Sequence, residues 1–527
     1  MSKRPRAPRT PPSHSPPDIG APLVNHLACA AAILAAAAFA WITRDQVNPD
    51  GVAYLDLARA VRRGDLASFV QGYWSPLYPV LLAVAGPSAA MAHGVNAVVM
   101  SAGAVLLHRR LVGAGAVAVA AVWAAYLVAS LVLVRISAVT PDLLLLVCMV
   151  GWWGALWGSP APRPVVAGAW AGAGFLAKTS LWPWLIVGTA ILYWREPGWR
   201  DRRMVGRYLL PLLALVALWV GPMSLEAGRP TFGVTGSLNA CWFLRGCDSQ
   251  TPDGHEGNHA AYVEVPVPGM GALSIARFDT SPWTYAPWSD PDAWARGVQS
   301  QSSTPLTVSH YAGIVLTNLW LAVRWSLSYM LIGPLLALFL AARWSGGRVS
   351  WRGRLTSPVV LLAVAGIAQF VAVQAVTRTL APFAFLLVVA ATSRGLEQLS
   401  ATRRRGLVAL PLLVAGLAAL RVGHFEWQFR TIEGPRLVEV RGFLDSLGPA
   451  FGRRTLLVVG PAVTLMPSAE QLGARIVGQV LPRSVPQLNT MNAAARQAAL
   501  VAAGGGRADV AIELDASGRT RLSVLSP

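Results

Sequence analysis

Long apolar runs separated by short polar segments make up most of the chain between residues 23 and 421. A transmembrane helix needs about 20 consecutive, mostly apolar residues, and eleven runs reach or approach that length. The pattern therefore predicts an all-α polytopic membrane domain, with about 11 transmembrane helices. The predicted spans are 23–43, 89–107, 114–134, 138–158, 164–178, 180–194, 208–226, 311–341, 357–376, 379–393 and 406–421.

Two polar segments, 44–88 and 227–310, are too long to be simple turns between spans, and the chain changes character after residue 421. In 422–527, short β-rich stretches alternate with helical ones, which predicts a small α/β domain. Residues 1–22 are basic and rich in proline, which is typical of a disordered tail.

Lys and Arg concentrate in alternate segments between the predicted spans, including 195–207, 342–356 and 394–405. Because positive residues favour the cytoplasmic side, this pattern predicts a cytoplasmic N-terminus. Both long loops and the domain at 422–527 are then extracytoplasmic. We expect a multi-pass protein of the plasma (inner) membrane.

The composition supports this interpretation and bears on the partners of the protein. The chain is 54% hydrophobic and only 13% charged, whereas about 25% charged residues is usual for soluble proteins. The formal net charge of +19 would suit nucleic acid, but the positive residues lie in short loops beside spans. We therefore expect membrane lipids, and no nucleic acid, as partners. The preference for Arg over Lys, with abundant Ala, Gly and Val, points to a bacterial source.

The first extracytoplasmic segment begins with a short predicted helix, "NPDGVAYLDLARAVRRG". Asn48 is a suitable N-cap, Pro49 suits the first helical position, and Gly64 follows the last basic residues. Asp50 and Tyr54 share one face of this helix. Asp50 could simply complement the helix dipole, which is worth about 0.3–1 kcal/mol. Alternatively, it is a carboxylate at a membrane-facing cleft that accepts a proton or holds a cation.

The stretch 72–86, "GYWSPLYPVLLAVAG", places Tyr78 and other aromatic residues at the expected membrane interface. Three further charges lie where hydrocarbon is expected, namely Asp142, Lys178 and Arg378. Charges near a span cost energy unless they are paired or hydrated, so they are candidates for a functional site. For the two cations, snorkelling to the interface is the simpler alternative. All three map to the same outer leaflet as Asp50.

Cys241 and Cys247 lie in the long loop and are candidates for a disulfide in an oxidising compartment. The same loop contains "HEGNH", which fits the H-E-x-x-H pattern of zinc hydrolases. That pattern needs a helix, and Gly257-Asn258 disfavours one, so we do not predict a zinc site.

In order along the chain, these motifs resemble the type C (GT-C) superfamily of polytopic glycosyltransferases. The resemblance is to protein mannosyltransferase-like and aminoarabinose transferase-like members and to an uncharacterised bacterial branch, and it covers residues 20–395. The motifs that carry it are "PDGVAYLDLA", "YWSPLYP", "TPDLLLL", "LAKTSLWPW", "RPTFGVTGSLNACWF", "PWSDPDAWARG" and "TRTLAPFAFLL".

The resemblance implies transfer of a sugar from a polyprenyl-phosphate donor to an extracytoplasmic glycan, lipid or protein acceptor. By position, Asp50 resembles the first-loop acid that acts as catalytic base or organises a metal, and Asp142 the second acid. Lys178 and Arg378 resemble cations for the donor phosphate, and Tyr54 and Tyr78 are further substrate-binding candidates. The resemblance implies no certain cofactor, and a divalent cation (Mg or Mn) is the one candidate.

This sequence departs from the family pattern at three positions. Gly51 follows Asp50 where many relatives carry a second acid, Thr379 stands where Tyr is usual, and Val234 stands where an acid often does. A transporter or flippase of a lipid-linked substrate and a catalytically inactive scaffold that binds a glycan lipid remain alternatives to an inverting transferase. Intramembrane charges serve transport as well as catalysis.

Overall fold

The computed structural model describes most of the membrane domain and parts of the C-terminal region. The described residues are 20–157, 161–245, 261–267, 271–277, 283–291, 307–325, 357–392, 413, 415–424, 426, 455–459, 469–470, 474–480, 484–505, 508–514 and 520–525.

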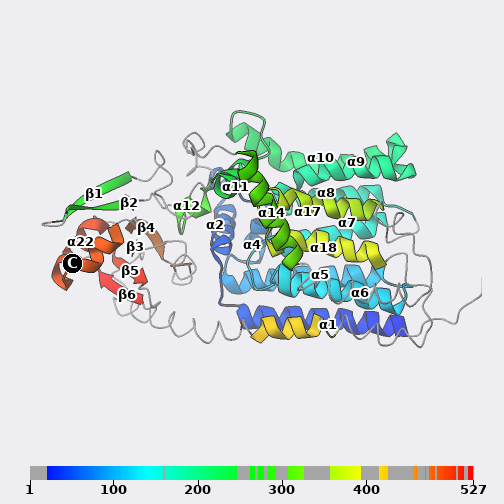
Figure 1. The fold of residues 1–527 in the computed structure, drawn as a ribbon, viewed down its shortest axis with the longest axis horizontal. Helices are drawn as coiled ribbons and strands as arrows, with labels where there is room; N and C mark the ends of the chain where they lie inside the picture. The colour runs from blue at the N-terminus through cyan, green and yellow to red at the C-terminus, as the bar shows by residue number, and fades with distance from the viewer. Residues whose placement is uncertain are drawn as a thin grey trace, which may run out of the picture.

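A bundle of apolar helices forms one half of the molecule, with its helices running side by side (Figure 1). Four of the described helices are long and apolar enough to cross a membrane: α1 (Gly20–Thr43), α5 (Ala89–Arg110), α6 (Ala116–Val128) with its π-helical extension η1 (Ala129–Leu133), and α10 (Arg202–Glu226). Shorter apolar helices pack among them: α7 (Asp142–Leu156), α8 (Pro164–Ala177), α9 (Trp182–Arg195), α17 (Pro358–Val371) and α18 (Thr377–Thr392).

The predicted membrane nature of the chain and its mostly helical architecture are confirmed by these helices. A described helix lies at each of the first ten predicted spans, the eighth being α14 (Val308–Trp325). The total of eleven stays a prediction, since 326–341 and part of 406–421 lie outside the described residues, as does nearly all of the predicted tail 1–22.

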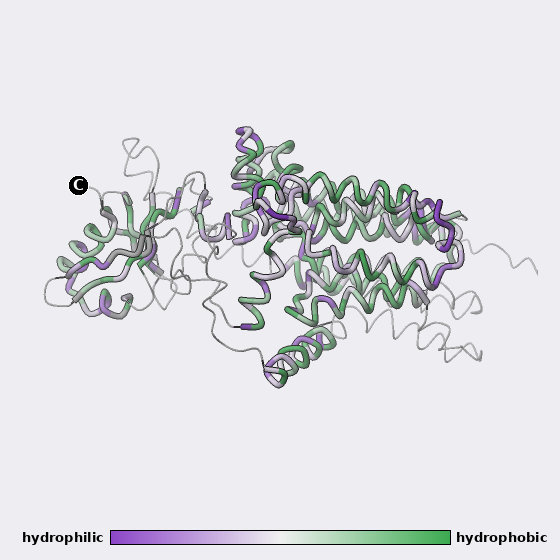
Figure 2. Tube along the Cα trace, turned by 90° about the horizontal axis from the view of Figure 1, so that it is seen from above, coloured by the Kyte–Doolittle hydropathy of each residue, from purple (hydrophilic) through white to green (hydrophobic). Residues whose placement is uncertain are grey.

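Hydrophobic residues cover most of the length of the bundle helices, and hydrophilic residues mark the end far from the sheet (Figure 2). Many side chains of α1 and α10 are exposed in the protein alone, as expected for helices that face lipid. The inner contacts use small residues. A Cβ at Gly168 of α8 would lie 2.0 Å from the Tyr208 carbonyl oxygen of α10, so only glycine permits this approach.

The other half of the molecule is a six-stranded sheet in the order β1-β2-β4-β3-β5-β6. Three parallel strands, β3 (Thr455–Val459), β4 (Arg475–Val480) and β5 (Val510–Leu514), form its centre, and β6 (Thr520–Val524) pairs antiparallel with β5. The helix α22 (Ala493–Gly504) packs against it through Leu500. This agrees with the alternating β-rich and helical stretches predicted near the C-terminus.

The remaining strands come from the long loop and were not predicted. The hairpin of β1 (Ala261–Val267) and β2 (Gly271–Arg277) joins the sheet through antiparallel pairing of β2 with β4. The sheet is therefore discontinuous in sequence, because two of its strands precede the last membrane helices. This topology ties the long loop to the C-terminal region.

A layer of short helices lies between the bundle and the sheet (Figure 1). It contains α2 (Pro49–Arg63), α3 (Leu66–Phe69), α4 (Leu77–Ala85), α11 (Thr235–Leu244) and α12 (Ala286–Ser289). The helix α2 has the predicted bounds, with Asn48 preceding it and Gly64 ending it at φ 72°, where glycine is favoured. Most of α2 is buried, on more sides than its amphipathic pattern predicted.

Candidate functional site

Four charged side chains that are far apart in the sequence meet at one end of the bundle. Arg378 contacts both acids, with its Nη1 2.7 Å from Asp50 Oδ2 and its Nε 3.7 Å from Asp142 Oδ2. Lys178 Nζ donates to Asp142 Oδ1. The result is a chain of alternating charges, Asp50–Arg378–Asp142–Lys178, which we call the charge chain.

Each member of the charge chain comes from the end of a helix. Asp50 and Asp142 lie in the first turns of α2 and α7, Arg378 lies in the first turn of α18, and Lys178 directly follows α8. A helix N-terminus carries a partial positive charge, which favours both acids where they stand. Because these helix ends open onto one level of the bundle, the fold brings together charges from four separate segments.

The charge chain runs from the protein interior to its surface. The Asp142 side chain is 1% exposed, Asp50 16%, Lys178 20% and Arg378 37%. A buried carboxylate such as Asp142 is tolerated only when it is paired, and two cations pair with it here. Arg378 carries five N–H donors in a planar fork, so it can hold both acids and still bind a further anion from the open side.

The N-terminus of α2 is fixed against the segment that leads into α7. Asn48 does not cap its own helix; its side-chain oxygen accepts a 2.7 Å hydrogen bond from the Val139 backbone N–H. A Cβ at Gly51 would lie 2.8 Å from Val139 Cβ, so a larger side chain at this position would have to displace Val139. This close approach sets the spacing between Asp50 and Asp142.

The turn that carries Lys178 is held from two sides. Ser75 Oγ accepts a 2.8 Å hydrogen bond from the Thr179 N–H, and the Gln369 amide of α17 donates to the Ser180 carbonyl at 2.5 Å. Ser75 and Thr179 are both buried. The Lys178 ammonium is thereby anchored at its backbone while its side chain reaches Asp142.

An aromatic cluster lies beneath Asp50. Tyr54 packs edge-on against Trp74 and Tyr78, with ring centroids 5.0 and 5.4 Å apart, and the Tyr78 hydroxyl donates to Asn96 at 2.8 Å. Burial, followed by the negative charges of Asp50 and Asp142, raises the pKa of Tyr54 well above its ordinary value. Its hydroxyl therefore keeps its proton. Tyr54 and Tyr78 are 4% and 1% exposed, so both rings are buried, and their role in substrate binding stays a prediction.

The long loop also reaches this region. The Val234 N–H donates to the Gly72 carbonyl at 2.8 Å, and the Thr235 hydroxyl donates to the Tyr73 carbonyl at 2.8 Å. These bonds place α11 beside the aromatic stretch that follows α2. Cys241 of α11 is disulfide-bonded, while Cys247 lies outside the described residues, so their pairing stays a prediction.

No group of three or more His, Cys, Asp or Glu within the described residues could hold a metal ion. The "HEGNH" motif falls outside those residues. The two acids that could serve a divalent cation, Asp50 and Asp142, share the Arg378 guanidinium instead. This donor set does not fit a metal in the geometry observed.

A second ionic network was missed by sequence reasoning. Asp56 of α2 is buried and contacts Arg59, three residues later, whose guanidinium also pairs with Glu470. The spacing of Asp56 and Arg59 is that of an ordinary helix-surface ion pair, and nothing in the sequence links it to Glu470.

An apolar groove of about 640 Å³ opens between α9 and α10. Trp182 and Phe232 stack at one end, with ring centroids 5.5 Å apart. Trp182 lies four residues after Lys178 in the sequence. Tyr193 and Trp194 line the other end, so the groove follows most of α9, a length of about 20 Å at 1.5 Å per residue. Its further lining residues are Phe175, Leu185, Ile186, Thr189, Ala190, Val205, Leu209, Leu212, Leu213 and Val216.

No family model matches the chain, and no curated protein matches it significantly. Among solved structures, it is similar to the crystal structure of ArnT from Cupriavidus metallidurans bound to undecaprenyl phosphate, with a TM-score of 0.51. The match covers 86% of this chain and 85% of that chain at 14% sequence identity. The fold is therefore that of a GT-C-like polytopic membrane protein, with ArnT as a structural neighbour. At this identity the comparison establishes the fold alone.

Proposed function

We propose that this protein is a membrane glycosyltransferase that moves a sugar from a polyprenyl-phosphate donor to an extracytoplasmic acceptor, with inversion at the anomeric carbon. The observation that carries this proposal is the charge chain, which joins an accessible carboxylate to two cations at one end of the bundle. A base and a phosphate-binding pair are the two functions that such a transfer needs.

In the proposed reaction, Asp50 takes the proton of the acceptor hydroxyl as its oxygen attacks the anomeric carbon. The bond between that carbon and the phosphate oxygen breaks, and its electrons leave with the polyprenyl phosphate, whose charge becomes more negative by one. Arg378 and Lys178 face this growing charge, and fixed cations stabilise it most where water is scarce. Asp142 touches both cations and keeps them in place.

The apolar groove between α9 and α10 supports a lipid-linked donor. It begins beside the turn that carries Lys178 and follows the membrane-facing helices. A polyprenyl chain placed in it would leave its phosphate near the two cations. The neighbour ArnT has been crystallised with undecaprenyl phosphate, a lipid of this class.

Transfer and transport make different products, and this difference tests the proposal. Purified protein in proteoliposomes is supplied with a polyprenyl-phosphate donor radiolabelled in the sugar and with a crude extracytoplasmic envelope fraction as acceptor. We expect label to appear in acceptor material, with release of free polyprenyl phosphate. Movement of intact donor across the bilayer without bond cleavage would favour a flippase, and saturable binding without turnover would favour a scaffold.

Filling the groove should weaken the binding of long donors only. We expect Ala190→Trp, within the groove lining, to raise the KM for a C55 donor at least tenfold and to leave the KM for a C10 donor within about twofold, because a short chain leaves most of the groove empty. The matched control is Val187→Trp, on the same helix but outside the lining and 46% exposed. Equal effects of Ala190→Trp on both donors would place the chain elsewhere.

A further inference from the structure

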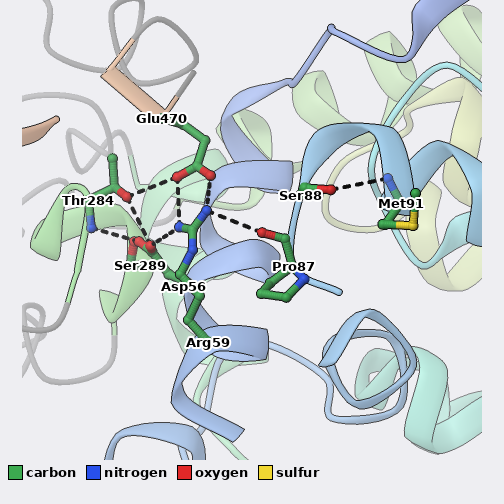
Figure 3. A network of polar contacts seen from close by, with 8 residues as sticks. All are labelled: Asp56, Arg59, Pro87, Ser88, Met91, Thr284, Ser289 and Glu470. Atoms are coloured by element: carbon green, nitrogen blue, oxygen red, sulfur yellow. Dashed lines mark hydrogen bonds and ion pairs between the residues drawn. The ribbon is translucent and has the colours of Figure 1, made fainter. Parts of the chain in front are cut away.

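A compact polar network fastens α2 to the extracytoplasmic sheet (Figure 3). Asp56 Oδ1 accepts from Arg59 at 3.0 Å and from the Thr284 hydroxyl at 2.9 Å, while Oδ2 accepts from the Thr284 N–H at 2.8 Å and from the Ser289 hydroxyl at 2.7 Å. Arg59 donates to both oxygens of Glu470, which belongs to the segment that connects β3 to β4 in the sequence. The Asp56 and Glu470 side chains are only 1% and 7% exposed.

The network joins three parts of the chain, α2, the loop around α12 and the segment of Glu470, and it stands beside a hydrophobic core that α2 shares with the loop and the sheet. Thr284 and Ser289 belong to the long loop around α12, and the Thr284 carbonyl accepts a 2.9 Å hydrogen bond from the Ile476 N–H of β4. The loop is therefore bonded to the sheet on one side and to Asp56 on the other. A displacement of the sheet would be transmitted to α2 through this carboxylate and its arginine, in addition to the apolar contacts that α2 shares with the sheet.

The same helix carries the proposed base. Asp50 and Asp56 are six residues apart on α2, about 9 Å along the helix axis. A buried helix moves as a rigid rod, because its hydrogen bonds and packing resist local bending. The position of Asp50 relative to Arg378 therefore depends on how the second turn of α2 is held.

The charges in the network do not balance. Asp56 and Glu470 share a single guanidinium, that of Arg59, and the bonds that Thr284 and Ser289 of the loop make to Asp56 come from hydroxyl and N–H groups. Burial, followed by the charge of Glu470, raises the pKa of Asp56 to about 6, although Arg59 and the bonds from Thr284 and Ser289 oppose the shift.

We propose that Asp56 is a positioning residue for the transfer reaction: its network with Arg59 and Glu470 latches the extracytoplasmic sheet to α2 and holds Asp50 against Arg378. The latch tightens when the network takes up one proton. This inference rests on the proposed function of Asp50. The latch links the sheet to the N-terminal end of α2, which carries Asp50.

The latch weakens as the pH rises, because the pKa of Asp56 is raised in the latched state. The latched state holds its proton up to about pH 6, whereas a released Asp56 loses it near its ordinary pKa of about 4. Latching is therefore strongest below pH 4 and weakens about tenfold per pH unit until pH 6, above which it stays constant. Between pH 5 and pH 7 the expected change is about tenfold.

Hydrogen exchange of the full-length protein in nanodiscs measures the latch without any assay of activity. The peptide spanning 283–291 contains the Thr284 N–H that bonds Asp56, and its exchange reports opening of the network. After correction for intrinsic rates, we expect its protection to fall about tenfold from pH 5 to pH 7. In Asp56→Asn this pH dependence should disappear, because the titrating carboxyl group is gone. In Glu470→Gln it should weaken, because the second cause of the raised Asp56 pKa is removed while its burial stays.

The matched control is Asp65→Asn, a nearby acid that caps α3 through Ser68 and has no contact with the network. It should keep the tenfold change. Protection that is equal at pH 5 and pH 7 in the unaltered protein, or a pH dependence that persists in Asp56→Asn, would overturn the latch.

Measurements of kcat and the donor KM then distinguish a positioning role of Asp56 from a purely structural one. We expect Asp56→Ala to lower kcat at least tenfold with the donor KM unchanged, because Lys178 and Arg378 stay in place. Asp56→Asn should retain most of kcat, and its kcat should no longer change through the latch between pH 5 and pH 7. A rise in the donor KM with unchanged kcat contradicts the positioning role. If the unaltered protein transfers no sugar, the proposed function fails, and the exchange experiment still decides whether the latch exists.

Discussion

Replacing Asp50 by Asn is expected to lower kcat for sugar transfer by about 10²–10⁴-fold, the contribution typical of a general base. The amide is nearly the same size as the carboxylate but cannot accept the acceptor's proton. It also keeps an oxygen that can accept from Arg378, now 2.7 Å from Asp50. Single-turnover transfer from a radiolabelled donor in nanodiscs measures the loss directly.

The matched control for this variant is Asp45→Asn. Asp45 lies five residues earlier, just after the C-terminal end of α1, and its side chain is 69% exposed beside Arg44. Its loss should leave kcat within about twofold, since exposed ion pairs contribute little. Asp50→Glu keeps a carboxylate and should retain more activity than Asp50→Asn. Transfer by Asp50→Asn at the unaltered rate, in a protein that melts normally, would remove Asp50 from the mechanism.

The sequence was most informative about features that repeat along the chain. Apolar runs and helix-end residues are local signals, so the bounds of α2 were predicted to within a residue, and the first ten predicted spans each hold a described helix. The C-terminal strands were visible for the same reason. The hairpin of β1 and β2 was not, because its pairing with β4 joins residues about 200 positions apart.

The charges of the site could be identified because each one is costly where it stands. Asp142, Lys178 and Arg378 lie at the ends of apolar helices, and a charge there demands a partner. The sequence could not say which partners they have. The bridging of both acids by Arg378 depends on the packing of α18 beside α2 and α7, which only the folded chain reveals.

Asp56 escaped notice for the opposite reason. In sequence it is one member of an i, i+3 pair with Arg59 on a short polar helix, and such pairs are commonly solvated. Its burial is created by the loop and sheet residues that cover it, Thr284 and Glu470 above all. Amphipathic patterns describe one covering surface, whereas α2 is covered on several sides by segments far away in the chain.

The second large effect is expected at Asp142, where stability and transfer should separate. Asp142→Ala leaves the Lys178 ammonium without its nearest carboxylate, and breaking a buried ion pair on one side costs about 3–5 kcal/mol. The double variant Asp142→Asn with Lys178→Met removes both charges and keeps the side-chain volumes. We expect it to regain most of the stability lost in Asp142→Ala, as measured by thermal unfolding in nanodiscs.

Transfer should not recover with stability. In the double variant the cation that faces the departing phosphate is gone, and the loss of one such fixed charge costs about 10²–10³ in kcat. The exposed pair of Arg44 and Asp45 is the control, because Asp45→Ala should change stability by no more than about 1 kcal/mol and leave transfer intact. A double variant that is both stable and fully active would show that Lys178 serves only to neutralise Asp142, and that Arg378 alone meets the phosphate.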